Sequence, residues 1–171
     1  MQFQGNFARD CASFEQAIGA GKSFDVVTRA FQAGGTDCRM YFINGMIQTD
    51  SALKLLGDLL AADANAMRIV QTAEQFAARF IACVETETTA DMQSAVTAVL
   101  SGQAVLLADG VSDAVIADVR CYPERAPDEP ENNRVLIGPH EGFNEILLRN
   151  TSMLRRRLRD SCTLATTFCQ R

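Results

Sequence analysis

Residues 25–45 read DVVTRAFQAGGTDCRMYFING, and this stretch carries the strongest signal for the fold class. Two runs rich in β-branched and aromatic residues flank the pair Gly34 and Gly35. Such runs around a glycine turn predict a β-hairpin. In the first run, Phe24, Val27 and Phe31 also fit helical spacing, so a helix is the alternative there.

Helical patterns follow the hairpin. The run TDSALKLLGDLLAAD begins with a Thr/Asp cap signal at Thr49 and predicts an amphipathic helix. Its apolar positions are Leu53, Leu56, Leu59 and Leu60. A second helical stretch is expected in residues 64–80, and the segment FIACVETET should then be extended.

A helix capped by Thr89 is predicted next, ending at Gly102. One face of it carries Met92, Ala95, Val96, Val99 and Leu100. The apolar runs AVLLADG and AVIADVRCY follow, separated by a short loop, and indicate two buried strands close together.

All four prolines lie between Pro123 and Pro139, where the acidic segment PERAPDEPENN predicts an extended, hydrated connector. After it, residues 142–159 predict a helix with most of its arginines opposite an apolar side. That apolar side consists of Phe143, Ile146, Leu147, Leu154 and Leu158. The last residues, TLATTFCQR, suggest a strand whose partner is missing.

Charge is distributed unevenly along the chain. The net charge is −5, yet six arginines from Gly142 onward face only Glu145 and Asp160, a local balance of +4 that leaves −9 for the rest. An acidic chain with a basic tail favours charge pairing within the protein or between subunits over nucleic-acid binding. Aromatic residues interleaved for base stacking are also missing around the arginines.

The six cysteines are scattered without a CxxC pair or zinc spacing, and the N-terminus lacks an apolar signal core. Both features predict reduced, mostly buried thiols in a reducing compartment. The sequence also contains no apolar run long enough for a membrane helix, so the chain as given is expected to be soluble.

Two motifs invite a catalytic interpretation. IGAGKSF, with Lys22, ends like a phosphate-binding P-loop, but Gln16 occupies the place of the first glycine and no strand precedes it, which favours a plain turn. His140, Glu141 and Glu145 could serve acid–base or metal chemistry. HExxH is absent, and carboxylates at a helix start already satisfy unpaired N–H groups. We therefore expect no catalytic residue, metal or cofactor.

The order of segments resembles the A-subunit (GerA) family of spore germination receptors, most strongly from residue 100 to residue 160. The resemblance rests on YFINGMIQTD, VLSGQAVLLADG, the proline-rich connector, GPHEGFNE and NTSMLRRR. The matching positions are Gly45, Leu100, Ser101, Gly102, Gly110, Arg125, Glu129, Pro130, Gly138, Pro139, Glu141, Gly142, Phe143, Glu145, Asn150, Leu154, Arg155, Arg156 and Arg157. His140 replaces a frequent arginine of the family.

The resemblance implies an α/β (α+β) fold with two small subdomains, joined by the Pro-rich acidic connector. The expected boundaries are residues 1–122 for the first subdomain, 123–137 for the connector and 138–171 for the start of the second, which is truncated. It also implies a soluble region on the cytoplasmic (core) side of the spore inner membrane, attached through a missing membrane-spanning part. The implied partners are the B and C subunits and other A subunits, in a non-enzymatic receptor that senses nutrients.

Residues 138–157 are therefore interpreted as a joint. In this hypothesis GPHEGF forms a rigid turn, Phe143 anchors the helix, and Asn150 with Arg155, Arg156 and Arg157 fixes the helix against the connector or an adjacent subunit. Two alternatives stay open. One is a soluble nucleotide- or ligand-binding enzyme that uses Lys22, His140 and Glu141, and the other is a truncated relic without function.

Overall fold

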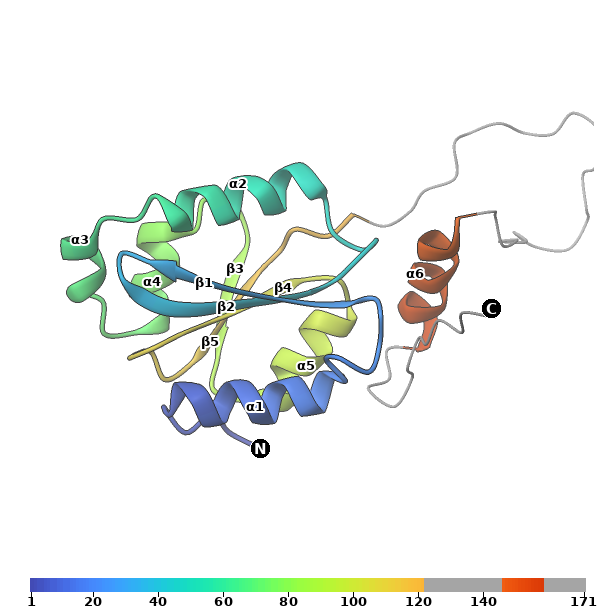
Figure 1. Ribbon diagram of the computed structural model, residues 1–171, viewed down its shortest axis with the longest axis horizontal. Coiled ribbons are helices and arrows are strands. Elements are labelled where there is room, and N and C mark those ends of the chain that lie inside the picture. The colour runs from blue at the N-terminus through green and yellow to red at the C-terminus, as the bar shows by residue number, and fades with distance from the viewer. Residues whose placement is uncertain (122–145, 159–171) are drawn as a thin grey trace, which may run out of the picture.

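The computed structural model describes residues 1–121 and 146–158. In this part of the chain, five strands form one antiparallel sheet with the order β1-β2-β4-β5-β3, and helices cover both of its faces (Figure 1). The strands are β1 (Val26–Ala33), β2 (Thr36–Ile43), β3 (Thr86–Thr89), β4 (Ala104–Ala108) and β5 (Ala114–Ala117). The helices are α1 (Phe7–Ile18), α2 (Thr49–Leu60), α3 (Ala64–Arg68), α4 (Ala73–Phe80), α5 (Met92–Leu100) and α6 (Leu147–Leu158). The α+β class is confirmed.

The predicted hairpin is confirmed as β1 and β2. Ala33 pairs with Thr36 across Gly34 and Gly35, which have φ values of 54° and 81°. Positive φ at both central residues is characteristic of a type I′ turn, whose twist matches the right-handed twist of the strands. A side chain at Gly34 would also come within 2.9 Å of the Asp63 carbonyl oxygen, so the turn packs closely against the start of α3.

Strand alternation divides the core between the two faces of the sheet. On one face, α1 and α5 cover Tyr41 and Ile43, and Phe14 packs edge-on against the Tyr41 ring at a centroid distance of 5.0 Å. On the other face, α2 and α4 cover Cys38 and Met40. β4 and β5 are buried on both faces, as their continuous apolar sequences predict.

The helix after the hairpin is confirmed as α2, but its buried face differs from the prediction. Ala52, Leu55 and Leu59 are buried, whereas Leu53 is 62% exposed and Leu60 is also exposed. Leucines lie on several sides of this helix, so their spacing alone did not identify the inner side. The unexpected exposure of Leu53 leaves apolar surface beside β1.

The second helical stretch is two helices, because Thr72 starts a new one by accepting a hydrogen bond from the Gln75 backbone N–H. The cap of α5 is Asp91 rather than Thr89, whose hydroxyl accepts a hydrogen bond from the Asp91 backbone N–H instead. All five residues of the predicted inner face of α5 are buried.

The described cysteines carry free thiols. Cys11 and Cys38 are buried, and burial raises the pKa of Cys38 to about 12. Cys83 is half-buried and Cys121 is exposed. The expectation of buried thiols is therefore confirmed for the first two.

Candidate functional site: the α6 joint

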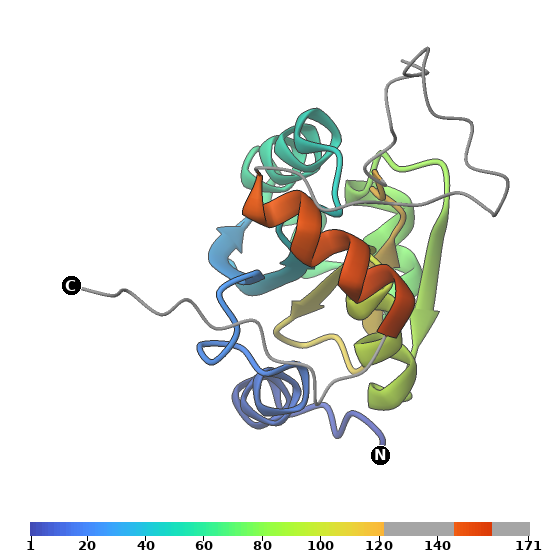
Figure 2. The same cartoon turned by 90° about the vertical axis from the view of Figure 1, so that its right-hand side faces the viewer.

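α6 lies across one end of the body that residues 1–121 form, and it runs from the side of α2 toward α5 (Figure 2). It begins at Leu147, and the Ile146 carbonyl oxygen accepts the first helical hydrogen bonds. The predicted start at residue 142 lies outside the described residues. The buried residues of α6 are Ser152 and Arg155. Polar side chains therefore attach the helix. We call the contacts of these two residues the α6 joint.

The first contact of the α6 joint is a close approach to the β2–α2 connection. Gly45 has φ 86°, and its carbonyl oxygen lies 3.1 Å from the Ser152 hydroxyl, which is also 2.6 Å from the Leu148 carbonyl oxygen. A β-carbon at residue 45 would lie 2.7 Å from the Ser152 oxygen. Glycine is thus required both by the left-handed backbone and by the neighbouring helix.

The second contact is a buried ion pair. Arg155 is 2% exposed and donates from Nε to Asp25 Oδ2 at 2.8 Å and from Nη2 to Asp25 Oδ1 at 3.0 Å. The same Nη2 donates to the Ser23 hydroxyl at 2.8 Å, and that hydroxyl donates to Asp25 Oδ1 at 2.5 Å. Two parallel N–H···O bonds fix the guanidinium plane as well as its position.

The two partners differ in how fully they are satisfied. Burial by itself raises the pKa of the Asp25 carboxyl, but hydrogen bonds from Arg155 and Ser23 outweigh it and hold this pKa below its ordinary value. Asp25 is therefore ionised at neutral pH. Nη1 of Arg155 is buried and has no hydrogen-bond partner in the described part of the chain. An unsatisfied buried donor costs about 1 to 3 kcal/mol, which limits the net stability of the joint.

The α1–β1 connection positions Ser23 and Asp25. Gly19 ends α1 with φ 71°, and its carbonyl oxygen accepts hydrogen bonds from the backbone N–H groups of Lys22 and Ser23. These N–H groups are therefore turned into the loop, and Lys22 is exposed. The segment IGAGKSF thus forms a turn between α1 and β1, as the sequence favoured. Its Ser23 hydroxyl donates a hydrogen bond to the Asp25 carboxylate, which directly follows the segment.

The described residues of the apolar side predicted for α6 are exposed. Ile146, Leu147, Leu154 and Leu158 are between 44% and 57% exposed. The periodicity of these residues predicted the helix correctly, but Asp25 and Gly45 contact the polar side. In the described part of the chain, α6 therefore presents a row of large apolar side chains outward.

The remaining predicted site residues divide into two groups. Asn150 is half-buried, and Arg156 and Arg157 are exposed near the end of α6, where cations suit the helix dipole. The others lie outside the described residues, so their roles stay predictions. They are Arg125, Glu129, Gly138, Pro139, His140, Glu141, Gly142, Phe143 and Glu145.

Sequence reasoning missed the partners of Arg155. It placed the arginine against the connector or another subunit, whereas the structure pairs it with Asp25 of the same chain. Gly45 was noted only as a matching family position, and nothing in the residues around Asp25 or Ser23 identifies them as partners of α6.

Acid should weaken the α6 joint. Because the pKa of Asp25 is lowered in the folded chain, its contribution to stability is present above its unfolded pKa of about 3.9 and is lost as pH falls through the folded value. We expect the difference in unfolding free energy between wild type and Asp25→Asn, measured in urea at a series of pH values, to shrink below about pH 4. A difference that stays constant with pH would contradict a lowered pKa.

The described residues, 1–121 and 146–158, contain no helix of the length and apolarity that a bilayer crossing requires. Nor do they bring three or more metal-ligating side chains together.

The fold of the described residues recurs in a solved structure. It matches the crystal structure of the N-terminal domain of the A subunit of the Bacillus megaterium spore germinant receptor GerK3 with a TM-score of 0.69 at 15% identity, over 94% of this chain and 58% of that chain. At this identity the match shows the fold alone.

The family model described as "Bacillus/Clostridium GerA spore germination protein" matches residues 13–168, and the chain belongs to this family. It is 30% identical over 155 residues to stage V sporulation protein AF of Bacillus subtilis, covering 91% of this chain and 31% of that protein. It is 25% identical over 162 residues to spore germination protein GerLA of Bacillus cereus, covering 94% and 32%. The chain thus spans about a third of the length of these relatives.

Proposed function

We propose that this chain is the N-terminal soluble part of a spore germinant receptor A subunit, and that it acts as an assembly and signal-coupling module in nutrient-triggered germination. Membership of the GerA family supports the receptor role. The observation that carries the coupling role is the α6 joint, in which a buried ion pair attaches a helix whose apolar side faces outward.

The contacts of the α6 joint suit a part that transmits movement. A buried ion pair contributes little net stability over an apolar contact, but it specifies one arrangement, because losing either partner leaves an unpaired buried charge. Nη1 of Arg155, which has no partner among residues 1–121 and 146–158, weakens the docked state further. Such a contact can hold α6 in one register and still be released at modest cost.

The exposed side of α6 supports the proposed domain organisation. Large apolar side chains in a row normally pack against another folded body. In this proposal residues 1–122 form the first subdomain, 123–137 connect it to the second, and 138–171 begin the second, with α6 packing between the two. The assembled subunit would lie at the spore inner membrane with this region on the core side, beside the B and C subunits and other A subunits.

The test is nutrient-triggered dipicolinate release from spores that carry the gene with Arg155→Ala, with Arg149→Ala as the matched control. Arg149 lies on the same helix but is exposed. We expect Arg155→Ala to abolish the nutrient response and to leave release by a non-nutrient trigger unchanged, while Arg149→Ala responds normally. Spores lacking the gene that respond normally to a broad nutrient panel would overturn the receptor role. Loss with both variants would overturn the coupling role of the joint.

A further inference from the structure

β1 forms an open edge of the sheet. Within the described part of the chain it pairs only with β2, and it lies at the outer edge beneath α2 (Figure 2). The pairing with β2 is continuous over all eight residues, without a bulge or a proline. Proteins usually blunt such an edge, because its free backbone groups accept another strand.

The pairing alternation shows which backbone groups are free. Ala33 and Thr36 flank the hairpin turn and form a pair that exchanges hydrogen bonds. Every second residue does the same, so the backbone groups of Phe31 and Arg29 also bond to β2. The backbone N–H and C=O groups of Thr28 and Ala30 consequently point to the open side. Both residues are exposed, so an incoming strand can reach them.

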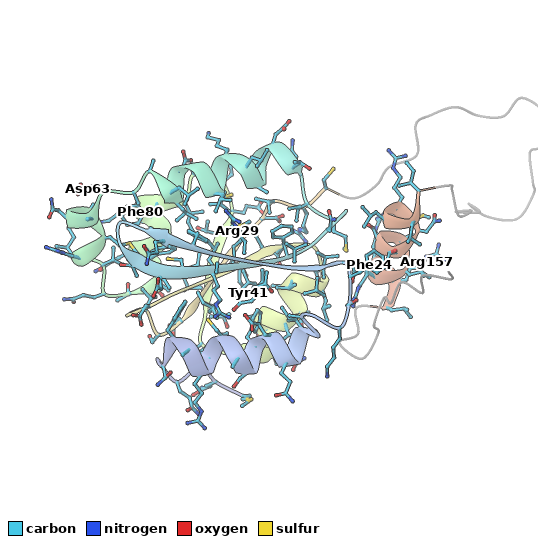
Figure 3. The ribbon with its side chains drawn as sticks, viewed as in Figure 1. Phe24, Arg29, Tyr41, Asp63, Phe80 and Arg157 are labelled. Atoms are coloured by element: carbon cyan, nitrogen blue, oxygen red, sulfur yellow. The ribbon has the colours of Figure 1, made fainter. Side chains whose placement is uncertain are left out.

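An apolar groove lies beside this edge. A cavity of about 370 Å³ separates α2 from the hairpin, and it is lined mainly by apolar side chains. Those used here are Val27 of β1, Phe42 of β2, and Leu53 and Leu56 of α2. Arg29 is the charged residue of the lining, and it extends from β1 toward α2 (Figure 3).

We propose that an extended peptide segment of a partner adds to β1 as a further strand, with alternate side chains entering this groove. A strand beside an open edge gains backbone hydrogen bonds, and pockets for alternate side chains give specificity. The residue next to Val27 would be apolar, and the residue next to Arg29 would be acidic. Arg29 has no ion pair or hydrogen bond within the described residues that would compete for such a carboxylate.

The charge of the groove favours a different partner over a second copy of this chain. Two β1 strands paired around a twofold axis near their centre would place two Arg29 side chains next to each other, and like charges directly opposite destabilise a sheet. A segment with an apolar residue two positions before an acidic one would place the apolar side chain in the groove and the carboxylate beside Arg29. This surface goes beyond the proposed coupling role and does not depend on it.

Two synthetic peptides test the proposal: Thr-Val-Thr-Glu-Thr-Leu-Thr, and the same peptide with Lys in place of Glu. Titration of the isotope-labelled chain, followed by nuclear magnetic resonance, reports binding through the amide signals of Thr28 and Ala30. We expect the Glu peptide to bind about tenfold more tightly than the Lys peptide. Arg29→Glu should reverse this preference. Absence of binding by the Glu peptide at about 1 mM would overturn the proposal.

Ala30→Pro separates strand addition from simple filling of the groove. Its lost N–H points outward, so the β1–β2 pairing remains, as for prolines on natural edge strands. Ala30→Val keeps the N–H and is the matched control. We expect only the proline variant to lose binding. Equal binding by both variants would show groove filling alone, and self-association of the chain that Ala30→Pro abolishes would assign the edge to a second copy. Either result overturns the proposal, and the charge reversal at Arg29 tests it even if the proline variant fails to fold.

Discussion

Arg155→Ala should cost about 3 to 5 kcal/mol in the docking of α6, because it leaves the Asp25 carboxylate buried without its cation. The unpaired carboxylate of Asp25 can reach water in two ways. The chain can unfold more easily as a whole, or α6 can leave so that water reaches the carboxylate. Urea unfolding measures the first effect, and hydrogen exchange of the α6 amides measures the second.

Matched changes isolate the ion pair in this experiment. Arg149→Ala removes an exposed arginine from the same helix and should change the unfolding free energy by no more than about 0.5 kcal/mol. Arg155→Lys keeps the charge but cannot form both parallel bonds to Asp25, so we expect only partial rescue. If Arg155→Ala matched Arg149→Ala in stability and in α6 protection, the buried ion pair would not be what holds the helix.

The same experiment distinguishes two roles for the apolar side of α6. If Ile146, Leu147, Leu154 and Leu158 pack against another folded body in the assembled receptor, a second contact holds the helix there. The loss of protection in Arg155→Ala should then be larger in this isolated chain than in the complete A subunit. An equal loss in both would indicate that the polar contacts alone determine where α6 lies.

Local patterns explain why much of the fold could be predicted from the sequence. The hairpin follows from β-branched runs around Gly34 and Gly35, and the paired strands β4 and β5 follow from two apolar runs separated by a short loop. α5 was predicted with its correct buried face, since its apolar residues lie on one side of the helix. In each case the deciding residues are neighbours in the sequence.

The α6 joint could not be predicted in the same way. Asp25 and Arg155 are 130 positions apart, and the chain contains 21 acidic residues that an arginine could pair with. The apolar periodicity of residues 146–158 located the helix, but it carries no information about which residues the polar side of the helix contacts. Arg155 and Gly45, both matching family positions, are the sequence features that lie at the true contact.

Gly45→Ala should disrupt the joint from its other side. The residue has φ 86°, and a left-handed backbone costs a residue with a side chain about 1 to 2 kcal/mol. The new β-carbon would also lie 2.7 Å from the Ser152 hydroxyl oxygen and 3.3 Å from the Leu148 carbonyl oxygen. Overpacking of this kind costs about 1 to 3 kcal/mol more unless α6 moves away.

Gly110→Ala is the control that separates backbone strain from the clash. Gly110 has φ 80°, and a β-carbon there would meet no atom within 4 Å, so it carries the strain without the collision. We expect Gly45→Ala to be less stable than Gly110→Ala in urea unfolding, and Ser152→Ala to recover part of the difference when it is added to Gly45→Ala. Equal losses for the two glycine variants would mean that α6 is not held against Gly45. If the difference appears but Ser152→Ala does not reduce it, the collision must lie with the α6 backbone at Leu148 instead.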